Sequence, residues 1–474
     1  MEIGELTAAE QRLWRAFPRR EQVDLSDAGD REVRASVIQA LLLGAQAAEP
    51  GHLAAVVLIG AHVTGVLDLS YAEVPHPVRM ARCRFDSPIE MASARLRELS
   101  LSGSQLPGLR AGKAAVAGTL ELSYTRFTGR VILAGARIEG ALLLNGASVE
   151  ATDGVAVNAA RLAVGQDLCA QRGFRSTGEL VLNDSVVNGS LLLEGATISS
   201  PSGLALTAHG LEVRSVANCC DGFTATGKVS FTGAKVGSRL CFTDARLSNP
   251  DGTALSCRHV QTNQLVLTTA APVRGAFDLR YARVGLLRDD AAAWPAVVML
   301  QGLTVDTVDS RATLQQRLEW LRRDPDGYLP QPYEQLAALY RRHGQEDQAR
   351  TVLLAGQRHR RRSQPLPVRA WGYVQDVVLG FGYRPARAAA WFAALMAAGA
   401  LYFSDHPPSP ASDAPPFVPL LYSLDLLLPV IDLGQESEFQ ARGAGAWIAA
   451  GLILAGWVLA TTIAVAAARL LRRP

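Results

Sequence analysis

The sequence predicts a mainly β chain whose centre is wound into a parallel β-solenoid. Segments that begin at Gly129, Gly178 and Gly227 share the pattern glycine-x-apolar-x-apolar and follow one another at a constant spacing of 49 residues. A fixed period of this length is typical of stacked copies of one supersecondary unit rather than of a globular core. Apolar residues at every second position within each copy indicate short strands, because alternate side chains of a strand point to one face.

A shorter unit explains how these strands turn. It consists of a glycine, apolar residues two and four positions later, a small residue near the seventh position and an apolar residue at the ninth, as in Gly65, Leu67, Leu69, Ala72 and Val74. The odd step from the fourth to the seventh position keeps the apolar face inward only if the chain bends there. We therefore expect strands joined by corners, with two turns of about 24 residues in each period and roughly ten turns over residues 52–290.

Turn-forming segments recur once per period, at Thr152-Asp-Gly154, Pro201-Ser-Gly203 and Pro250-Asp-Gly252. Their composition is that of loops, and their spacing predicts that they line one edge of the solenoid. Such loops are either spacers or a surface that binds partners.

The rhythm of the apolar residues resembles that of pentapeptide-repeat proteins. Ala136-Arg-Ile138-Glu-Gly140, Ala196-Thr-Ile198 and Ala245-Arg-Leu247 follow the Ala-x-Leu-x-x pattern. The resemblance implies a right-handed parallel β-helix. The steps from Ile138 to Leu144 to Val149 are six and five residues, so the sequence departs from a strict period of five, and the strict period of six of left-handed hexapeptide helices is absent.

Both ends of a solenoid need covers, because their strand edges are unpaired. Residues 1–50 are expected to form an N-terminal helical cap, in which 31–44 is a helix with an apolar stripe, followed by the solenoid over 51–310. Residues 311–365 are expected to form a helical hairpin. This segment resembles one tetratricopeptide unit, on the residues Tyr333, Leu336, Ala337, Tyr340, Gly344, Ala349 and Leu353. A single unit implies a capping hairpin or a small docking site.

The C-terminal part predicts a membrane hairpin. We expect a basic juxtamembrane segment over 366–387, a transmembrane helix over 388–404, an extracytoplasmic loop over 405–443 and a second transmembrane helix over 444–471. Arginine clusters flank this region, which predicts a multi-pass protein of the inner plasma membrane with the solenoid and the C-terminus in the cytoplasm. A basic collar is formed by Arg358, Arg360, Arg361, Arg362 and Arg369. We expect it to contact anionic lipid headgroups, and nucleic acid or a soluble partner is the alternative.

The loop between the two predicted spans contains an apolar segment, 417–436, that is too short to cross a membrane. It is expected to lie in the interface or to dip back into the bilayer. Asp425, Asp432 and Gln435 are its candidate functional residues, because acids near a membrane are costly; the alternative is that the carboxylates cap short helices. Tyr422–Asp425 and Leu428–Gln435 look like a signature of uncharacterised bacterial membrane proteins that join a repeat domain to a helix pair. Members of that group often carry an oxidoreductase label but no established activity.

Composition narrows the classes of function. The net charge of +3 and the lack of a long basic stretch on the solenoid argue against nucleic acid as a partner. None of the six cysteines forms a Cys-x-x-Cys pair, so we expect buried thiols and neither a metal nor another cofactor. The N-terminus has no apolar signal segment, so export of the solenoid is not expected.

The leading hypothesis is a membrane-tethered cytosolic repeat scaffold that binds other proteins and has no catalytic residues; an oligomer is left open. A channel or sensor is the first alternative, since a short apolar segment lies between two predicted spans. An oxidoreductase or other enzyme with a site in a solenoid groove is the second. Its candidate side chains are Asp167, Asp184, Asp244 and Asp278.

Overall fold

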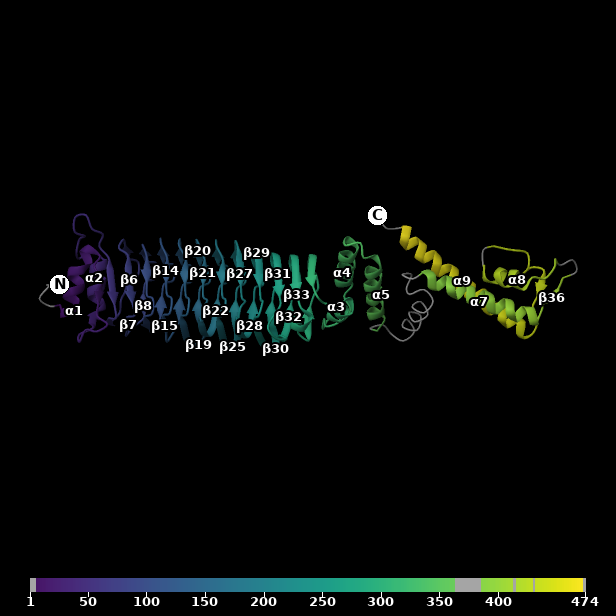
Figure 1. The fold of residues 1–474 in the computed structure, drawn as a ribbon, viewed down its shortest axis with the longest axis horizontal. Coiled ribbons are helices and arrows are strands. Elements are labelled where there is room, and N and C mark those ends of the chain that lie inside the picture. Colours follow the sequence, from purple (N-terminus) through teal and green to yellow (C-terminus); the bar gives the residue numbers. More distant parts are fainter. Residues whose placement is uncertain (1–5, 363–384, 412–414, 429–430, 472–474) are drawn as a thin grey trace. The chain divides into compact units, whose positions relative to one another are not determined.

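The computed structural model describes residues 6–362, 385–411, 415–428 and 431–471; within them, the side chains of 152–153, 201, 362, 385–389 and 461–471 are left undescribed. The chain divides into two compact units, Met1–Gln335 and Leu336–Pro474. The first unit is a parallel β-solenoid of about 11 turns, with helices at its ends (Figure 1). The prediction of a solenoid is therefore confirmed.

Two parallel sheets form the walls of the solenoid, and each turn crosses both. Each sheet carries two ladders of short strands, and the strands of the two ladders merge toward the C-terminal end. The first ladder of one sheet comprises β3 (Val56–Ile59), β6 (Val78–Ala81), β10 (Leu99–Ser100), β14 (Leu120–Glu121), β18 (Leu142–Leu143), β21 (Leu168–Cys169), β24 (Leu191–Leu192) and β27 (Val216–Asn218). Its second ladder comprises β5 (Glu73–Val74), β9 (Arg95–Leu96), β13 (Ala115–Val116), β17 (Arg137–Ile138), β20 (Ala163–Val164), β23 (Val186–Val187) and β26 (Glu212–Val213). Both continue in β29 (Lys235–Cys241), β31 (Gln261–Leu267), β33 (Arg283–Asp289) and β35 (Thr304–Ser310).

The opposite sheet is built in the same way. One ladder starts with β4 (His62–Thr64), β7 (Arg84–Phe85), β11 (Gln105–Leu106) and β15 (Arg126–Phe127), and the other with β8 (Ile89–Glu90), β12 (Leu109–Arg110) and β16 (Val131–Ile132). Both continue in β19 (Ser148–Asn158), β22 (Arg175–Val181), β25 (Thr197–Thr207), β28 (Thr224–Ser230), β30 (Arg246–Ser256), β32 (Arg274–Asp278) and β34 (Val297–Met299).

The register explains the period of 49 residues. Leu142, Leu168, Leu191, Ala217 and Leu240 are successive partners in one ladder, so turns of 26 and 23 residues alternate. The longer turns contain the 11-residue strands β19, β25 and β30, where the pairing contains β-bulges, whereas β22 and β28 in the shorter turns have 7 residues. Bulges insert residues without breaking a sheet. The predicted edge segments thus recur once per period, as the bulged residues that interrupt the pairing of β19, β25 and β30.

Tight turns form the corners between the two sheets. In Leu69–Ala72 the amide of Ala72 donates to the carbonyl of Leu69 at 3.0 Å, and Tyr71, the third residue, has φ 60°. The first residue, Leu69, points inward and is buried, and the fourth, Ala72, is half-buried. These are the apolar and small residues of the predicted unit, so the corner lies where the odd step placed it. Aspartate, arginine and glycine also occupy the third position, for example Asp184, Arg161 and Gly135.

Leucine and valine side chains stack turn upon turn inside the coil. Leu99, Leu120, Leu142, Leu168 and Leu191 occupy one register position and are at most 2% exposed. Each fully buried side chain of this kind stabilises the fold by about 1.5–3 kcal/mol relative to exposure. The repeated burial of one position per strand is what holds the turns in register.

The N-terminal cap covers the first turn with α1 (Ala8–Ala16), η2 (Phe17–Arg19) and α2 (Ala35–Leu42). Thr7 and Glu10 form a capping box on α1. The buried Glu10 carboxylate also accepts hydrogen bonds from the Arg34 backbone and guanidinium at 2.6–3.0 Å. Strands β1 (Val23–Asp24) and β2 (Glu32–Arg34) pair with β3 and β4. The helix predicted over 31–44 is therefore shorter than expected, because Glu32–Arg34 form strand β2 and the helix starts at Ala35.

The C-terminal end of the solenoid is covered by η3 (Ala291–Ala293), α3 (Leu314–Leu321) and the start of α4 (Pro330–Arg342). Arg317 on α3 makes two hydrogen bonds to Asp289, at 2.7 and 2.8 Å, and both side chains are buried. Its guanidinium also lies over the rings of Trp294 and Trp320, at 4.8 and 4.9 Å. The side-chain amides of Gln331 and Gln335 donate to the carbonyls of Leu303 and Val305. These contacts satisfy acceptors that an open strand edge would expose.

The second unit contains the rest of α4, α5 (Glu346–Arg362), α7 (Pro385–Asp405), α8 (Pro419–Leu427) and α9 (Ala444–Leu471), together with the short pair β36 (Ser409–Pro410) and β37 (Phe439–Gln440). Helix α8 packs against α7 and α9 at two glycines. A Cβ on Gly456 would lie 2.4 Å from the Leu427 carbonyl oxygen, and one on Gly399 would lie 2.8 Å from Ser423 Oγ. A side chain at Gly456 would collide with the backbone of α8, and one at Gly399 would press on the Ser423 side chain.

The prediction of two transmembrane helices, over 388–404 and 444–471, is wrong for the described residues. Within that part of the chain no helix has both the length and the apolar character needed to cross a membrane. Helix α7, which contains the first predicted span, ends on the charged Asp405.

Candidate functional site: a groove along one sheet

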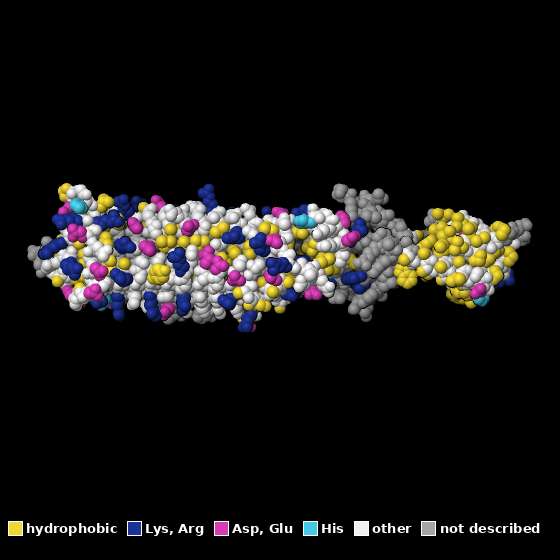
Figure 2. Space-filling model, in the orientation of Figure 1, with side chains coloured by type: hydrophobic (Ala, Val, Ile, Leu, Met, Phe, Trp, Pro, Cys, Tyr) yellow, Lys and Arg dark blue, Asp and Glu magenta, His cyan; other side chains and the backbone are white. Residues whose placement is uncertain are grey.

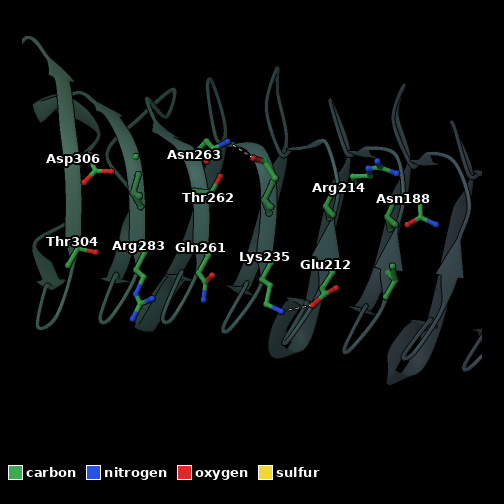
Figure 3. A pocket seen from close by; sticks show the side chains of 17 residues that line it. Asn188, Glu212, Arg214, Lys235, Gln261, Thr262, Asn263, Arg283, Thr304 and Asp306 are labelled. Carbon is green, nitrogen blue, oxygen red and sulfur yellow. Dashed lines mark hydrogen bonds and ion pairs between the residues drawn. The ribbon is translucent and has the colours of Figure 1, made fainter.

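A groove of about 830 Å³ runs along the outer face of the sheet that contains β23, β26, β29, β31, β33 and β35 (Figure 3). Two rows of outward side chains form its walls. One row is Val186, Glu212, Lys235, Gln261, Arg283 and Thr304, and the other is Asn188, Arg214, Gly237, Asn263, Gly285 and Asp306. Between the rows, Val187, Val213, Val236 and Val284 point inward and are buried, so their backbone is the floor of the groove.

The alternation of side chains along the strands explains this arrangement. Residues on either side of an inward valine point outward, and parallel pairing repeats them at each turn, as shown by the partners Val213, Val236, Thr262 and Val284. With strands about 4.8 Å apart, six turns give walls roughly 24 Å long. Neighbouring turns thus present a fixed row of polar groups.

Contacts within the groove hold part of the walls in place. Lys235 Nζ lies 2.7 Å from Glu212 Oε1, and Asn263 Nδ2 donates to the Gly237 carbonyl at 2.7 Å (Figure 3). A Cβ on Gly237 would lie 2.1 Å from the Arg214 carbonyl oxygen, so no side chain can fill the groove at that position. The walls offer guanidinium, amide and hydroxyl groups, which bind by hydrogen bonds and charge.

The predicted residues of the second unit, Asp425, Asp432 and Gln435, are brought together. The buried Asp425 carboxylate accepts hydrogen bonds from the backbone amides of Leu433, Gln435 and Glu436, at 2.7, 2.9 and 2.8 Å. Asp432 accepts from the Gly434 amide at 2.8 Å, and Gln435 Oε1 from the Val418 amide at 3.3 Å. These contacts support a structural role, in which the side chains fix the loop after α8.

Glu436 lies beside these carboxylates in a cavity of about 550 Å³ that also includes Trp457. Burial raises the pKa of Glu436, and the neighbouring Asp425 and Asp432 raise it further. Burial, with Glu436 and Asp425, also raises the pKa of Tyr422. Like charges that share a partly dry site have this effect on carboxyl groups and phenols.

Two of the five arginines of the predicted basic collar, Arg358 and Arg360, are exposed near the end of α5, and Arg361 is half-buried. The side chain of Arg362 and all of Arg369 lie outside the described residues. What the collar binds stays a prediction.

Each of the four aspartates of the enzyme hypothesis either makes a local hydrogen bond or occupies a corner of the solenoid. Asp167 accepts from the Ser190 amide at 2.7 Å, and Asp278 binds the Arg280 guanidinium at 2.8 Å. Asp184 and Asp244 occupy corners with φ 53°. All six cysteines are buried and free. Burial raises the pKa of Cys83 and Cys169 to about 11, so these thiols are poor nucleophiles and ligands.

Sequence reasoning missed the groove residues. Arg214 and Asn263 occupy equivalent places in successive copies of the repeat, since each follows an inward residue, Val213 or Thr262. Comparing the outward positions of the copies would have placed both in one row.

Comparison with models of protein families, with curated proteins and with solved structures finds no match to this chain.

Proposed function

We propose that the protein is a repeat scaffold that binds other proteins through the groove of its solenoid. The observation that carries the proposal is the continuous polar groove along β23 to β35, on walls whose spacing is set by the stacked turns. Stacked repeats supply extended surfaces without a deep pocket. A rigid surface also loses little conformational entropy on binding, which favours association.

The resemblances in the sequence support the same proposal. The corner pattern resembles that of right-handed pentapeptide-repeat coils, and the helices α4 and α5 that flank Gly344 resemble one tetratricopeptide unit. Both kinds of repeat are structural modules, so neither resemblance calls for a reaction centre.

The C-terminal unit supports attachment to lipid, as a second part of the proposal. Figure 2 shows apolar side chains over most of the visible face of the part of this unit that contains α7, α8 and α9. Leu401, Trp447 and Leu454 are 71%, 82% and 69% exposed, and exposed apolar patches of this kind mark interaction surfaces. Arg358 and Arg360 favour anionic headgroups, which face the cytoplasm. Flotation of the full chain with vesicles should be lost when Trp447 and Leu454 are replaced by glutamine; unchanged flotation would contradict lipid attachment.

A photo-crosslinking amino acid at Asn188, inside the groove, tests the scaffold function in cells. We expect a discrete protein adduct at this site and none at Arg137, an exposed residue of the same ladder outside the groove. Gln261→Trp, a substitution at an exposed position in the wall, should block the groove and remove the adduct. An adduct that forms equally at position 137, or that survives Gln261→Trp, would show that partners bind elsewhere.

A further inference from the structure

An apolar cleft of about 240 Å³ lies between α7 and α9 in the second unit. Trp391 and Leu395 of α7 form one wall, and α9 contributes the floor and the other wall with residues between Gly451 and Leu459. All the residues that line this α7–α9 cleft are apolar. A ligand that fits the lining has to be apolar as well, because burying a polar group without a partner is costly.

Gly451, at the floor of the cleft, has no packing reason to be glycine. It lies inside a helix, where glycine is destabilising relative to alanine. At Gly399 and Gly456 the close approach of α8 leaves little room for a side chain, whereas among the described residues no atom lies within 4 Å of a Cβ added to Gly451. Ala455 continues the floor one turn later. The effect of these two small residues is to keep the cleft open.

The cleft opens onto the apolar face for which we propose lipid attachment. Leu454, which is 69% exposed, belongs both to that face and to the lining of the cleft, and Trp391 on the other wall is 44% exposed. Helix α8 packs elsewhere on α9, because Gly456 lies about 140° around the helix from Gly451, at about 100° per residue. A lipid at the apolar face can therefore reach the cleft.

The dimensions of the cleft favour one kind of apolar ligand. From Gly451 to Leu459 the cleft follows α9 for about 12 Å, at about 1.5 Å per residue, and an acyl chain of one bilayer leaflet spans about 15 Å. Spread over this length, 240 Å³ gives a mean cross-section of about 20 Å². A single unbranched chain fits such a section, because carbon atoms in contact lie about 4 Å apart. A partner helix, about 10 Å across, does not fit.

We infer that the α7–α9 cleft binds one acyl chain of a membrane phospholipid. The inference rests on the proposed lipid attachment and adds to it a specific site. Exposed apolar side chains can adsorb to any lipid surface, whereas a cleft of this width holds one chain in one place. Each methylene that leaves water for apolar surroundings strengthens binding by about 4-fold, so a chain that fills the cleft is bound firmly.

Photolabelling of the full-length protein in water tests this inference. The probe is a monoacyl phospholipid that carries a diazirine near the end of its chain and is added below its micellar concentration. A free fatty acid with the same chain is the second probe. Mass spectrometry should locate the adducts of the phospholipid on Leu395, Leu454 and their neighbours in the cleft.

Gly451→Leu should reduce labelling of the cleft by about 10-fold or more, because its side chain displaces at least two methylenes and each contributes about 4-fold to binding. The matched control Ala446→Leu places the same side chain at an exposed position of α9 outside the cleft, and it should leave the labelling unchanged. Exchange protection of α9 verifies that each variant is folded. If Gly451→Leu loses this protection, Gly451→Met, whose side chain is more flexible, replaces it in the test.

Labelling that is spread evenly over the exposed apolar face, or that neither variant at Gly451 reduces, would overturn the inference. Labelling by the fatty acid alone would overturn it in favour of a ligand without a headgroup, and a loss of labelling at high protein concentration would favour a second copy of the chain in the cleft. Flotation separates this failure from failure of lipid attachment. If the protein floats with vesicles but its cleft is not labelled, attachment stands without an acyl site; if it does not float, the attachment itself is wrong.

Discussion

Replacing Arg317 by alanine should release the helical cover from the last turn of the solenoid. The arginine makes two hydrogen bonds to Asp289, at 2.7 and 2.8 Å, and both residues are 4% exposed. The substitution leaves the Asp289 carboxylate buried with Trp294 Nε1 as its remaining side-chain donor, at 3.1 Å. Removing one member of a buried ion pair costs about 3–5 kcal/mol, because the other charge is left uncompensated.

Hydrogen exchange read by mass spectrometry measures this loss locally. The amides of β33, β35 and α3 should lose protection equivalent to about 3–5 kcal/mol, whereas the first turns should change little. Arg95→Ala is the matched control, since Arg95 pairs with Glu73 at 3.3 Å with both side chains about three-quarters exposed. An exposed pair of this kind contributes no more than about 1 kcal/mol.

A second variant separates lost charge balance from lost packing. Arg317→Met with Asp289→Asn removes both charges and keeps an oxygen acceptor for Trp294, so it should recover about 2 kcal/mol or more relative to Arg317→Ala. The reasoning is refuted if Arg317→Ala loses no more protection than Arg95→Ala, or if the double variant is less stable than the single one.

Three further predictions concern other parts of the chain. Burial acts to raise the pKa of Glu10, but hydrogen bonds from Arg34 and Thr7 outweigh it, so the pKa in the folded protein is lower than 4.5. A carboxyl group with a lowered pKa stabilises the fold at pH values above its unfolded pKa, and this stabilisation is lost as the pH falls. Exchange protection of α2 should therefore decrease below about pH 4.5, and Glu10→Gln should remove this pH dependence. All six thiols should resist Ellman's reagent at about pH 8 and react only in denaturant, because all six are buried and burial also raises the pKa of Cys83 and of Cys169. Rapid labelling of the native protein would contradict this. Gly456→Ala should speed proteolysis around α8, because the added Cβ meets the Leu427 carbonyl. The matched control Gly451→Ala has nothing within 4 Å of its Cβ and should stabilise α9 by up to about 1 kcal/mol. Equal proteolysis rates in the two variants would show that the close approach of Leu427 is unimportant.

The solenoid could be predicted because its causes are local. Alternating apolar residues, the odd step at Leu69 to Ala72 and the constant period all follow from burial of one side of each strand and one corner per unit. The extent of α2 was not predictable in this way. Val33 suits a helix stripe and a strand equally well, and its pairing with Val63, a contact made only in the folded chain, decides between them.

The groove could not be predicted without the register. Arg214 and Arg283 come to line the same groove only after turns of different length have been laid over one another. The loop after α8 shows the same limit. The sequence marks Asp425 and Asp432 as acids near apolar residues, but only the folded loop shows that the Asp425 carboxylate collects three backbone amides.

The bulges in β19, β25 and β30 have a consequence for how such a protein can change its length. Because long and short turns alternate, removal of a single turn would set two strands of the same length side by side, either two long or two short, and would change the pairing at the junction. Removal or duplication of both turns restores the original neighbours at the junction. The chain is therefore extendable as a series of interchangeable cassettes of two turns, each adding about 10 Å of reach while the rest of the molecule is left as it was.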